Sequence, residues 1–493
     1  MLLSKLAQIL DFPSVDKSDV DISWVESDSR QVAAGALFFP KQGEHFDGLH
    51  FIDEVIGRGV SAIVVPEKID KPIPQLLAPR SQEVLKKICQ ALYDHPTSKM
   101  NMIGVTGTNG KTSTSYFIEA ILQYASCKVG YVGTTQYRWP GTTMDAKLTT
   151  PMYEMLQKYF YQMQLDQVET VVMECSSHGI ELGRIDDIAF DVCVYTNLSH
   201  EHLDFHKTMQ EYAQAKAKLF TKHLATSPKK NKIAVINVDD EVGKNWVSQG
   251  IAENTCTYSM HPGADIYPTS LVTTDNGMQM TLSMMGEKVE IFMPTFGQYN
   301  VMNTMAAMLA CKVQGVDVAT MKACIEKGIA VPGRLQKVDI DAPFTVIVDF
   351  AYTEDALRNV LQTLTPFRQN RIVTVFGCGG DRDATRRPKM AKAVYEYADR
   401  LIMTTDNPRT EDPASIIDEM AQGIRTEKEY ATKVEIIVDR RAAIEKSLQM
   451  AQPGDIVLIA GKGHETYQEI HGVRYPFNDQ EVVQTYWEQY AQR

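Results

Sequence analysis

The sequence lacks several features that define specialised classes of protein. It has no apolar run near the roughly 18 residues that a membrane helix needs, and its start, "MLLSKLAQILDF", is too short and too interrupted for a signal peptide. The eight cysteines are scattered without a CxxC pair, which argues against a disulfide framework and against a zinc knuckle. Internal repeats and low-complexity tracts are also missing. These absences predict a cytoplasmic protein with reduced thiols.

An excess of basic residues is missing as well. The 62 Asp and Glu residues outnumber the 50 Lys and Arg residues, and the net charge is −12. No basic stripe offsets this charge, which argues against nucleic acid as the main partner. A local basic pocket for an anionic small molecule stays open. We expect small-molecule substrates, no membrane insertion and a monomeric chain.

The length of 493 residues predicts about three domains, because one hydrophobic core cannot serve so long a chain. Residues 1–98 alternate short apolar strands with polar turns and end in a helical stretch before a linker. Residues 99–332 have strands so uniformly apolar that they indicate a mostly parallel sheet covered on both faces. Within them, "SLVTTDNGMQMTLSMMGEKVEIFMP" alternates and predicts antiparallel hairpins added to that sheet. Residues 333–493 repeat the strand and helix rhythm, so the predicted fold class is α/β.

The segment "MIGVTGTNGKTSTSYFIEAIL", residues 102–122, predicts a phosphate-binding loop between a strand and a helix. A glycine turn at this place points successive backbone N–H groups at one spot, where the helix dipole attracts phosphate. Lys111 can then reach the terminal phosphates, and the Thr112 hydroxyl can ligate magnesium. Val105 stands where the strict GxxxxGK[ST] spacing has its first glycine, so the tight turn is instead Gly107 to Gly110. The alternative, an ordinary glycine turn, is disfavoured by the apolar strand before it and the helix after it.

Acidic and histidine side chains follow two later strands. Glu174 comes directly after an apolar run, and a phosphate loop needs a metal-binding carboxylate at the end of a neighbouring strand. Another apolar strand leads into "YTNLSHEHLDFH", whose His200, His202 and His206 lack the CxxC or HExxH companions typical of zinc sites. Each histidine alone is more readily explained as a surface or capping residue. Glu174 and His202, at adjacent strand ends beside a phosphate loop, are more informative together than either residue is alone.

Taken together, these motifs resemble the Mur ligase family, and within it the ligases of MurE type, which add the third residue to the cell-wall precursor UDP-N-acetylmuramoyl-L-Ala-D-Glu. The resemblance covers essentially the whole chain. It rests on "DSR" at residues 28–30, "GTNGKT", "TTP" at residues 149–151, "ECSSHGIELGR", "TNLSHEHLDFH", "YAQAKAKLF", "GQYNVMN", "PGRLQKV", "GCGGDRD", "DNPR" and "GKGHETYQ". It implies three domains: a UDP-muramoyl-binding domain at 1–98, a central ATP-binding P-loop domain with a parallel sheet at 99–332, and a Rossmann-like amino-acid-binding domain at 333–493.

The resemblance also implies binding residues for each substrate. For the UDP-muramoyl group they are Ser27, Ser29, Glu44, His45, Phe46, Thr149, Thr150, Ser176 and Arg184. For ATP they are Gly107, Thr108, Asn109, Gly110, Lys111, Thr112, Asn300, Arg334 and Asp349. For the incoming amino acid they are Arg382, Asp406, Asn407, Pro408, Arg409, Gly461 and Glu465.

The same resemblance implies Lys111, Glu174, His202 and Lys216 as catalytic residues. Thr112, Glu174, His202 and Lys216 are implied as ligands of two Mg²⁺ ions. Lys216, in "YAQAKAKLF", matches a family lysine that becomes carbamylated. A carbamate is an anionic oxygen ligand, whereas an ammonium beside two magnesium ions would be repelled. Without the resemblance, Lys216 would be interpreted as a solvated helix lysine.

Three positions depart from the family pattern. The family usually has D-[YF]-A-H-x-P where this chain has "DFAYTED", so Tyr352 replaces histidine and Glu354 replaces proline. Tyr352 can donate one hydrogen bond but cannot be a cation near neutral pH. Leu182 occupies a place where some relatives have glutamine. These changes leave open a paralogue that acts on a related substrate.

The predicted activity is ATP-dependent amide ligation in cytoplasmic peptidoglycan precursor synthesis. ATP would phosphorylate the side-chain carboxylate of D-Glu, and the amine of meso-2,6-diaminopimelate would attack the acyl phosphate. Diaminopimelate is expected rather than L-lysine, because the resemblance to diaminopimelate-adding enzymes implies that Arg409 and Arg382 lie near acceptor carboxylates, which a guanidinium can bind with two hydrogen bonds. The alternatives are the same ligase using L-lysine or another diamino acid, and a folylpolyglutamate or secondary-metabolite ligase. A nucleotide-binding regulatory module is the non-enzyme alternative.

Overall fold

The computed structural model describes residues 1–15, 19–43, 46–274 and 277–491. The chain divides into two compact units. One comprises Met1–Gly104, Cys127–Val192 and Lys218–Lys232, and the other comprises Val105–Ser126, Cys193–Ala217 and Ile233–Arg493. None of the described helices is both long enough and apolar enough to cross a membrane. All eight cysteines are free, as predicted.

A five-stranded sheet organises the N-terminal part of the chain, in the order β1-β5-β4-β3-β2. Strands β2 to β5 are parallel, and β1 is antiparallel to β5. Leu37 and Val64 pack in one hydrophobic cluster with α1 and α3, whereas Phe38 and Ile63 pack in another with α2. This alternation follows from the two-residue period of a strand whose sheet is covered on both faces. The elements are α1 (Leu3–Leu10), β1 (Ser14–Val15), β2 (Trp24–Glu26), β3 (Ala36–Phe38), α2 (Ile52–Gly57), β4 (Ala62–Val65), β5 (Gln75–Leu77) and α3 (Gln82–Tyr93).

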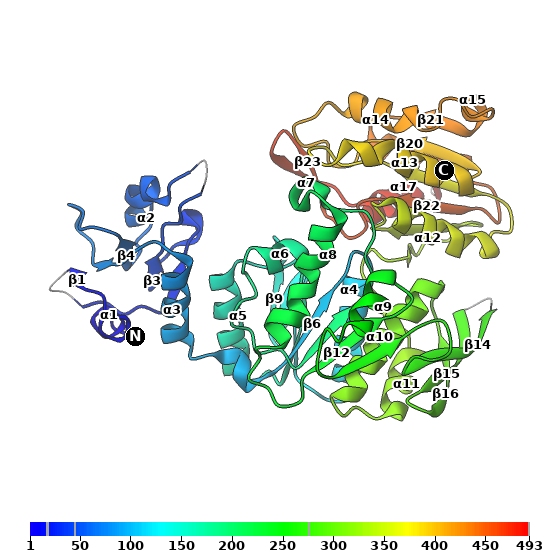
Figure 1. Cartoon of the computed structure of the whole chain (residues 1–493). Coiled ribbons are helices and arrows are strands. Elements are labelled where there is room, and N and C mark those ends of the chain that lie inside the picture. Colours follow the sequence, from blue (N-terminus) through cyan, green and yellow to red (C-terminus); the bar gives the residue numbers. More distant parts are fainter. Residues whose placement is uncertain (16–18, 44–45, 275–276, 492–493) are drawn as a thin grey trace. The chain divides into compact units, whose positions relative to one another are not determined.

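The central sheet has eleven strands in the order β16-β15-β14-β13-β12-β11-β6-β10-β7-β8-β9. Pairs such as β10·β7 and β12·β13 are parallel, whereas β14, β15 and β16 pair antiparallel, which confirms the predicted parallel sheet with added hairpins. In Figure 1 these antiparallel strands lie beside α11. The strands are β6 (Asn101–Thr106), β7 (Val129–Val132), β8 (Gln136–Trp139), β9 (Thr142–Asp145), β10 (Thr170–Glu174), β11 (Val192–Tyr195), β12 (Ile233–Asn237), β13 (Thr255–Tyr258), β14 (Ile266–Thr274), β15 (Gly277–Met284) and β16 (Glu287–Met293). The helices that bear on the site or cover this sheet are α4 (Lys111–Tyr124), α5 (Tyr153–Leu165), α6 (Ser177–Glu181), α7 (Leu203–His206), α8 (Met209–Lys218), α10 (Gln298–Val313) and α11 (Val318–Glu326).

The C-terminal sheet has the order β17-β18-β22-β19-β20-β21, and its strands from β18 to β21 are parallel. Helices α12, α13 and α14 bury their apolar faces in one cluster, and α16 and α17 bury theirs in a second cluster. Helices thus cover both faces of a parallel sheet, which agrees with the α/β class predicted from the strand and helix rhythm of residues 333–493. The elements are β17 (Gln336–Lys337), β18 (Thr345–Asp349), α12 (Glu354–Leu364), β19 (Ile372–Phe376), α13 (Arg387–Tyr397), β20 (Arg400–Met403), α14 (Pro413–Gln422), β21 (Val434–Ile436), α16 (Arg440–Met450), β22 (Ile456–Ala460), β23 (Tyr467–Ile470), β24 (Val473–Pro476) and α17 (Asp479–Ala491).

Candidate active site

The predicted phosphate loop joins the end of β6 to the first residue of α4. Gly107 has φ +147°, and a Cβ there would lie 1.8 Å from Thr196 Oγ1. Gly110 has φ +84°, and a Cβ there would lie 2.4 Å from Asn303 Oδ1. Both positions therefore need glycine, because a side chain would meet both an unfavourable backbone conformation and an occupied space. The turn is a packed structure and not merely a flexible link.

The end of β11 fixes this loop from a neighbouring strand. The backbone N–H of Thr108 donates to Asn197 O at 2.8 Å, and that of Asn109 donates to Asn197 Oδ1 at 2.9 Å. Thr196 Oγ1 donates to Asn109 O at 2.6 Å. The role of Thr196 and Asn197 as loop supports was not predicted from the sequence. The sequence pattern that could have indicated this role is the position of two hydrogen-bonding residues directly after an apolar strand.

Lys111 folds back over the loop that it belongs to. Its Nζ donates to Gly107 O at 3.0 Å and to Thr108 O at 2.9 Å. Thr112, the next residue, is buried in the first turn of α4, where magnesium-binding hydroxyls are placed in phosphate loops. The structure thus brings Gly107, Gly110, Lys111 and Thr112 together around one turn.

Lys216 lies next to the same loop and is almost completely buried, with 1% of its surface exposed. Its Nζ donates to Gly107 O at 2.8 Å and sits 4.4 Å from the centre of the Tyr212 ring. Burial lowers the pKa of the Lys216 ammonium well below its usual value, and the charge of Lys111 lowers it further. A buried lysine of this kind is not the solvated helix lysine that its sequence context suggested.

Tyr212 was missed by the sequence analysis. Its hydroxyl is 3.2 Å from Thr108 Oγ1, and its ring stacks on His206 at 5.1 Å. Tyr212 and Lys216 are four residues apart on α8, so they share one helix face. His206 is buried against Tyr212 and Phe205, which makes it a packing residue.

His202 caps α7 in a left-handed conformation, with φ +57°. Its Nε2 is 3.6 Å from Glu201 Oε2. Glu201 is buried, and its Oε1 has no hydrogen-bond partner in the part of the chain that the structure describes. The charge of Glu201 is the main cause that raises the pKa of Tyr352, and desolvation of Tyr352 adds to the shift. The electrostatic effect on Tyr352 thus comes from an acid beside His202.

Glu174 is the last residue of β10 and is fully buried. Its carboxylate accepts hydrogen bonds from Tyr131 Oη at 2.7 Å, from the Thr134 N–H at 3.0 Å and from Thr134 Oγ1 at 2.9 Å. The carboxylate is thus held in one orientation at the strand end where the sequence placed it. Its joint action with the phosphate loop stays a prediction.

Four predicted UDP-muramoyl residues gather beside Glu174. Thr150 Oγ1 donates to Glu174 O at 2.9 Å and lies 3.1 Å from Ser176 Oγ. Thr149 Oγ1 is 3.1 Å from Thr134 Oγ1. Arg184 Nη1 donates to Thr150 O at 3.0 Å, while its buried Nε has no partner among the described residues. The Nε–H of Arg184 can therefore donate a hydrogen bond to an acceptor group on a ligand.

The other predicted UDP-muramoyl residues lie in the N-terminal part. Ser27 Oγ hydrogen-bonds to Glu154, which also accepts from Lys41 Nζ at 2.8 and 3.0 Å. Ser29 begins a short 3₁₀ helix, and Phe46 exposes 56% of its surface. Glu44 and His45 lie outside the described residues. The buried Glu154, which no motif marked, orients both Ser27 and Lys41.

The three remaining ATP candidates come from α10 and the start of the C-terminal part. Asn300 is buried in the first turn of α10, and its Nδ2 donates to Phe296 O at 2.8 Å. The Arg334 guanidinium lies 4.8 Å from the centre of the Phe350 ring. Asp349 ends β18 and accepts from the Leu335 N–H at 2.6 Å. Burial raises the pKa of Asp349, and Arg334 opposes that shift.

The predicted amino-acid residues follow three neighbouring parallel strands. Asp406 to Arg409 follow β20, Gly461 and Glu465 follow β22, and Arg382 follows β19. Loops at the carboxyl edge of such a sheet are the usual ligand-binding position. The structure brings two of these loops into contact, since Asn407 Nδ2 donates to Glu465 Oε2 at 2.8 Å.

Further contacts fix these loops. Lys462 is fully buried, and its Nζ donates to Asn407 Oδ1 at 3.1 Å and to Glu465 Oε2 at 2.7 Å. Gly461 has φ +112°, and a Cβ there would lie 2.6 Å from Asp406 Oδ2. Arg409 Nη1 donates to Gly380 O at 2.5 Å. Arg382 is exposed.

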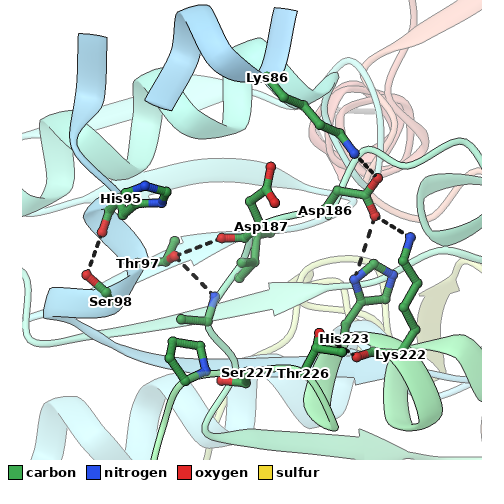
Figure 2. Close-up of a pocket in the computed structure, with 13 residues that line it drawn as sticks. Lys86, His95, Thr97, Ser98, Asp186, Asp187, Lys222, His223, Thr226 and Ser227 are labelled. Atoms are coloured by element: carbon green, nitrogen blue, oxygen red, sulfur yellow. Dashed lines mark hydrogen bonds and ion pairs between the residues drawn. The ribbon is translucent and has the colours of Figure 1, made fainter. Parts of the chain in front are cut away.

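The structure also contains a separate cavity of about 540 Å³. Figure 2 shows the residues that line it. The Asp186 carboxylate forms ion pairs there, through Oδ2 with Lys86 Nζ at 2.6 Å and through Oδ1 with Lys222 Nζ at 2.7 Å. None of the predicted site residues lines it. Among the described residues there is also no group of three His, Cys, Asp or Glu side chains that could hold a metal ion by itself.

Comparisons with known proteins agree with this geometry. Three family models match: the Mur ligase family catalytic domain over residues 21–91, the Mur ligase middle domain over 105–311 and the Mur ligase glutamate ligase domain over 333–463. The chain is 41% identical to the UDP-N-acetylmuramoyl-L-alanyl-D-glutamate–2,6-diaminopimelate ligase of Bacillus cereus, across 96% of this chain and 95% of that protein. A solved structure of a ligase with the same name matches with a TM-score of 0.63 at 32% identity, across 95% of each chain. The MurF ligase of Thermotoga maritima in complex with ADP, at 19% identity across 95% of this chain and 98% of that one and a TM-score of 0.68, shares the fold.

A phosphate loop in a central parallel sheet, joined to a Rossmann-like sheet with polar loops at its carboxyl edge, defines the three-domain acid–amino-acid ligases. The extent of the matches makes the assignment specific. The chain belongs to the Mur ligase family, among the ligases of MurE type. The predicted fold class and family are confirmed, while the domain boundaries at 98 and 332 stay predictions.

Proposed function

We propose that the protein is the ATP-dependent ligase that joins meso-2,6-diaminopimelate to the D-Glu of UDP-N-acetylmuramoyl-L-Ala-D-Glu. The observation that carries this function is the 41% identity, over 96% of the chain, to a relative named for that reaction. The preserved phosphate loop supports it, because ligation through an acyl phosphate needs ATP held by its phosphates. The substrates are small molecules, and the proposed location of the reaction is the cytoplasm.

The chain's own groups would contribute mainly position and charge. Lys111, already held over the loop by Gly107 O and Thr108 O, would turn its ammonium to the terminal phosphates of ATP. A fixed cation offsets the charge that develops during phosphoryl transfer. Asn300, Arg334 and Asp349 would hold the rest of the nucleotide.

Two Mg²⁺ ions, when bound, would neutralise the negative charge of the phosphates. Thr112, Glu174, His202 and carbamylated Lys216 are the proposed ligands. The residues fit hard cations, because Glu174 presents an oriented carboxylate and Glu201 Oε1 is a buried oxygen without a partner among the described residues. A magnesium site needs few protein ligands, since phosphates and waters complete it.

The proposed carbamate is supported by the position of Lys216. Its amine is buried beside the loop carbonyl of Gly107, where a solvated ammonium would have no place. Carbamylation needs the neutral amine, and a carbamate nitrogen keeps one N–H that can still donate to Gly107 O.

The substrate-binding residues fall into two proposed groups. Ser27, Ser29, Thr149, Thr150, Ser176 and Arg184 would bind the UDP-muramoyl group, together with residues 44–46. Asp406, Asn407, Pro408, Arg409, Arg382, Gly461 and Glu465 would bind the acceptor. The contact of Asn407 with Glu465 supports a joint acceptor site.

A substrate panel tests the function. Phosphate release from ATP is measured with UDP-N-acetylmuramoyl-L-Ala-D-Glu and, in turn, meso-diaminopimelate, L-lysine, L-ornithine and no amino acid. We expect turnover that depends on both the precursor and diaminopimelate. Turnover with a pteroylglutamate in place of the precursor, or equal turnover without an amino acid, would contradict the proposal.

A further inference from the structure

A fully buried ion pair lies at the carboxyl edge of the C-terminal sheet. Arg440, the first residue of α16, and Asp479, the first residue of α17, both have no exposed side-chain surface. Arg440 Nε donates to Asp479 Oδ1 at 2.8 Å, and Nη2 donates to Asp479 Oδ2 at 2.7 Å. Two parallel hydrogen bonds of this kind fix the plane of the guanidinium.

The same guanidinium also contacts the ends of two strands. Nη2 donates to Ala460 O at 3.1 Å, and Nη1 donates to Thr405 O at 3.4 Å. Ala460 is the last residue of β22 and precedes Gly461, while Thr405 precedes Asp406. Arg440 therefore joins the backbone at the starts of both proposed acceptor loops.

We propose that Arg440, fixed by Asp479, is a positioning residue that sets the spacing of the two acceptor loops and thereby the affinity for the acceptor amino acid. This inference rests on the proposed function, because it concerns the site to which that function assigns the acceptor. Neither side chain reaches a substrate, since both are fully buried. They act on the two acceptor loops through the hydrogen bonds from Arg440 to Thr405 O and Ala460 O.

The contacts between the two acceptor loops show why the distance between these loops matters. Gly461 stands so close to Asp406 that a Cβ would lie 2.6 Å from its Oδ2. Asn407 and Glu465 are joined both directly and through Lys462. A shift of one loop by about 1 Å would stretch these contacts beyond the usual length of a protein hydrogen bond, and the proposed ligands of the acceptor would separate.

Stability alone does not explain a buried ion pair, because an apolar pair of similar volume is often as stable or more stable. The chain supplies a matched control at the opposite edge of the same sheet. Arg371 and Asp455 form a second bidentate pair, with Arg371 Nη2 2.6 Å from Asp455 Oδ2. These two residues directly precede β19 and β22, far along the strands from the acceptor loops.

The experiment compares Arg440→Lys and the apolar double variant Arg440→Met/Asp479→Leu with the control Arg371→Lys. Michaelis constants are measured for the acceptor that the wild-type enzyme uses, for ATP and for the UDP-linked precursor, together with thermal unfolding. We expect both Arg440 variants to raise the acceptor KM about tenfold or more, while the other two constants change less than about twofold. The control variant should lower Tm without this selective effect. Hydrogen exchange of residues 405–409 and 461–465 should accelerate only in the Arg440 variants.

A folded double variant with an unchanged acceptor KM would overturn the positioning role. So would a control variant that raises the acceptor KM as much as Arg440→Lys does. If the wild-type enzyme uses no diamino acid, the proposed function fails. The exchange measurement still decides the inference in that case, because unchanged protection of both loops would refute it.

Discussion

The Nζ of Lys216 donates a hydrogen bond of 2.8 Å to the carbonyl oxygen of Gly107. Gly107 opens the phosphate loop, and Lys216 lies on α8, 109 residues further along the chain. The bond therefore ties the proposed carbamate position to the turn that is proposed to hold the phosphates. Tyr212, one helical turn before Lys216, completes the link through Thr108.

Replacing Lys216 by alanine should abolish ligation because the proposed anionic metal ligand is lost. Acetate or formate added to the buffer should partly restore turnover by occupying the vacated space. The wild-type enzyme incubated with ¹³C-bicarbonate should show a carbamate carbonyl signal in its NMR spectrum. Lys218→Ala is the control, because Lys218 is on the same helix but pairs with Glu181 at 2.6 Å. Full activity of Lys216→Ala would refute the role.

Replacing Lys111 by alanine should reduce kcat more than tenfold, which corresponds to more than about 1.4 kcal/mol of barrier. The charge that faces the phosphates is removed, while no core volume is lost. Tm of the variant should stay within a few degrees of the wild-type value. A variant that keeps a tenth or more of the wild-type kcat would show that the loop lysine is not required.

Local patterns predicted much of the fold and part of the site. The phosphate loop was recognisable because its strand, glycine turn and helix are contiguous, and Glu174 because it ends an apolar run. Residues that act across the fold left no such pattern. Asn197 supports a loop 88 residues away, and Glu154 joins Ser27 across 127 residues. Arg440 and Asp479 have the appearance of ordinary helix-terminal charges until packing brings them together.

The stability of the protein should fall between about pH 6.5 and pH 4 in a way that depends on His223. Burial, with the nearby Lys222, lowers the pKa of His223 to about 4, despite Asp186 and Asp187, which act in the other direction. In this pH range the unfolded chain binds a proton that the folded protein does not, so stability decreases as the pH falls. The loss of unfolding free energy caused by His223 approaches about 3 kcal/mol at pH 4.

Urea unfolding of His223→Gln at pH 7, 6, 5 and 4 measures this contribution. The variant should lose less stability than the wild-type protein over that range, because glutamine does not titrate. The exposed His261 provides the control His261→Gln, which should follow the wild-type curve. Parallel curves for His223→Gln and the wild-type protein would mean that His223 has the same pKa in the folded and unfolded states, which would contradict the prediction.

The enzyme should prefer meso-diaminopimelate to L-lysine, and Arg409 should carry much of that preference. The two acceptors differ at the distal end, where diaminopimelate has a carboxylate beside its ammonium and lysine has the ammonium alone. Arg409 is partly buried, with Nη1 bonded to Gly380 O and Nε 4.0 Å from Glu469. Its left-handed backbone, with φ +52°, is held by the bond from the Arg409 N–H to Glu469 O at 3.0 Å. The guanidinium is thus held by groups of the protein itself.

A charge-assisted hydrogen bond contributes about 1.5–3 kcal/mol, so a bidentate contact supplies on the order of a hundredfold selectivity. Lysine would also bring its ammonium close to the guanidinium without a carboxylate between them, which adds repulsion to the lost attraction. The ratio of kcat/KM for the two acceptors should therefore fall by about two orders of magnitude in Arg409→Ala. Arg382→Ala, which removes an exposed guanidinium from the neighbouring loop, tests whether that residue shares the task. An Arg409→Ala enzyme that favours diaminopimelate undiminished would place the selecting charge elsewhere in the acceptor loops.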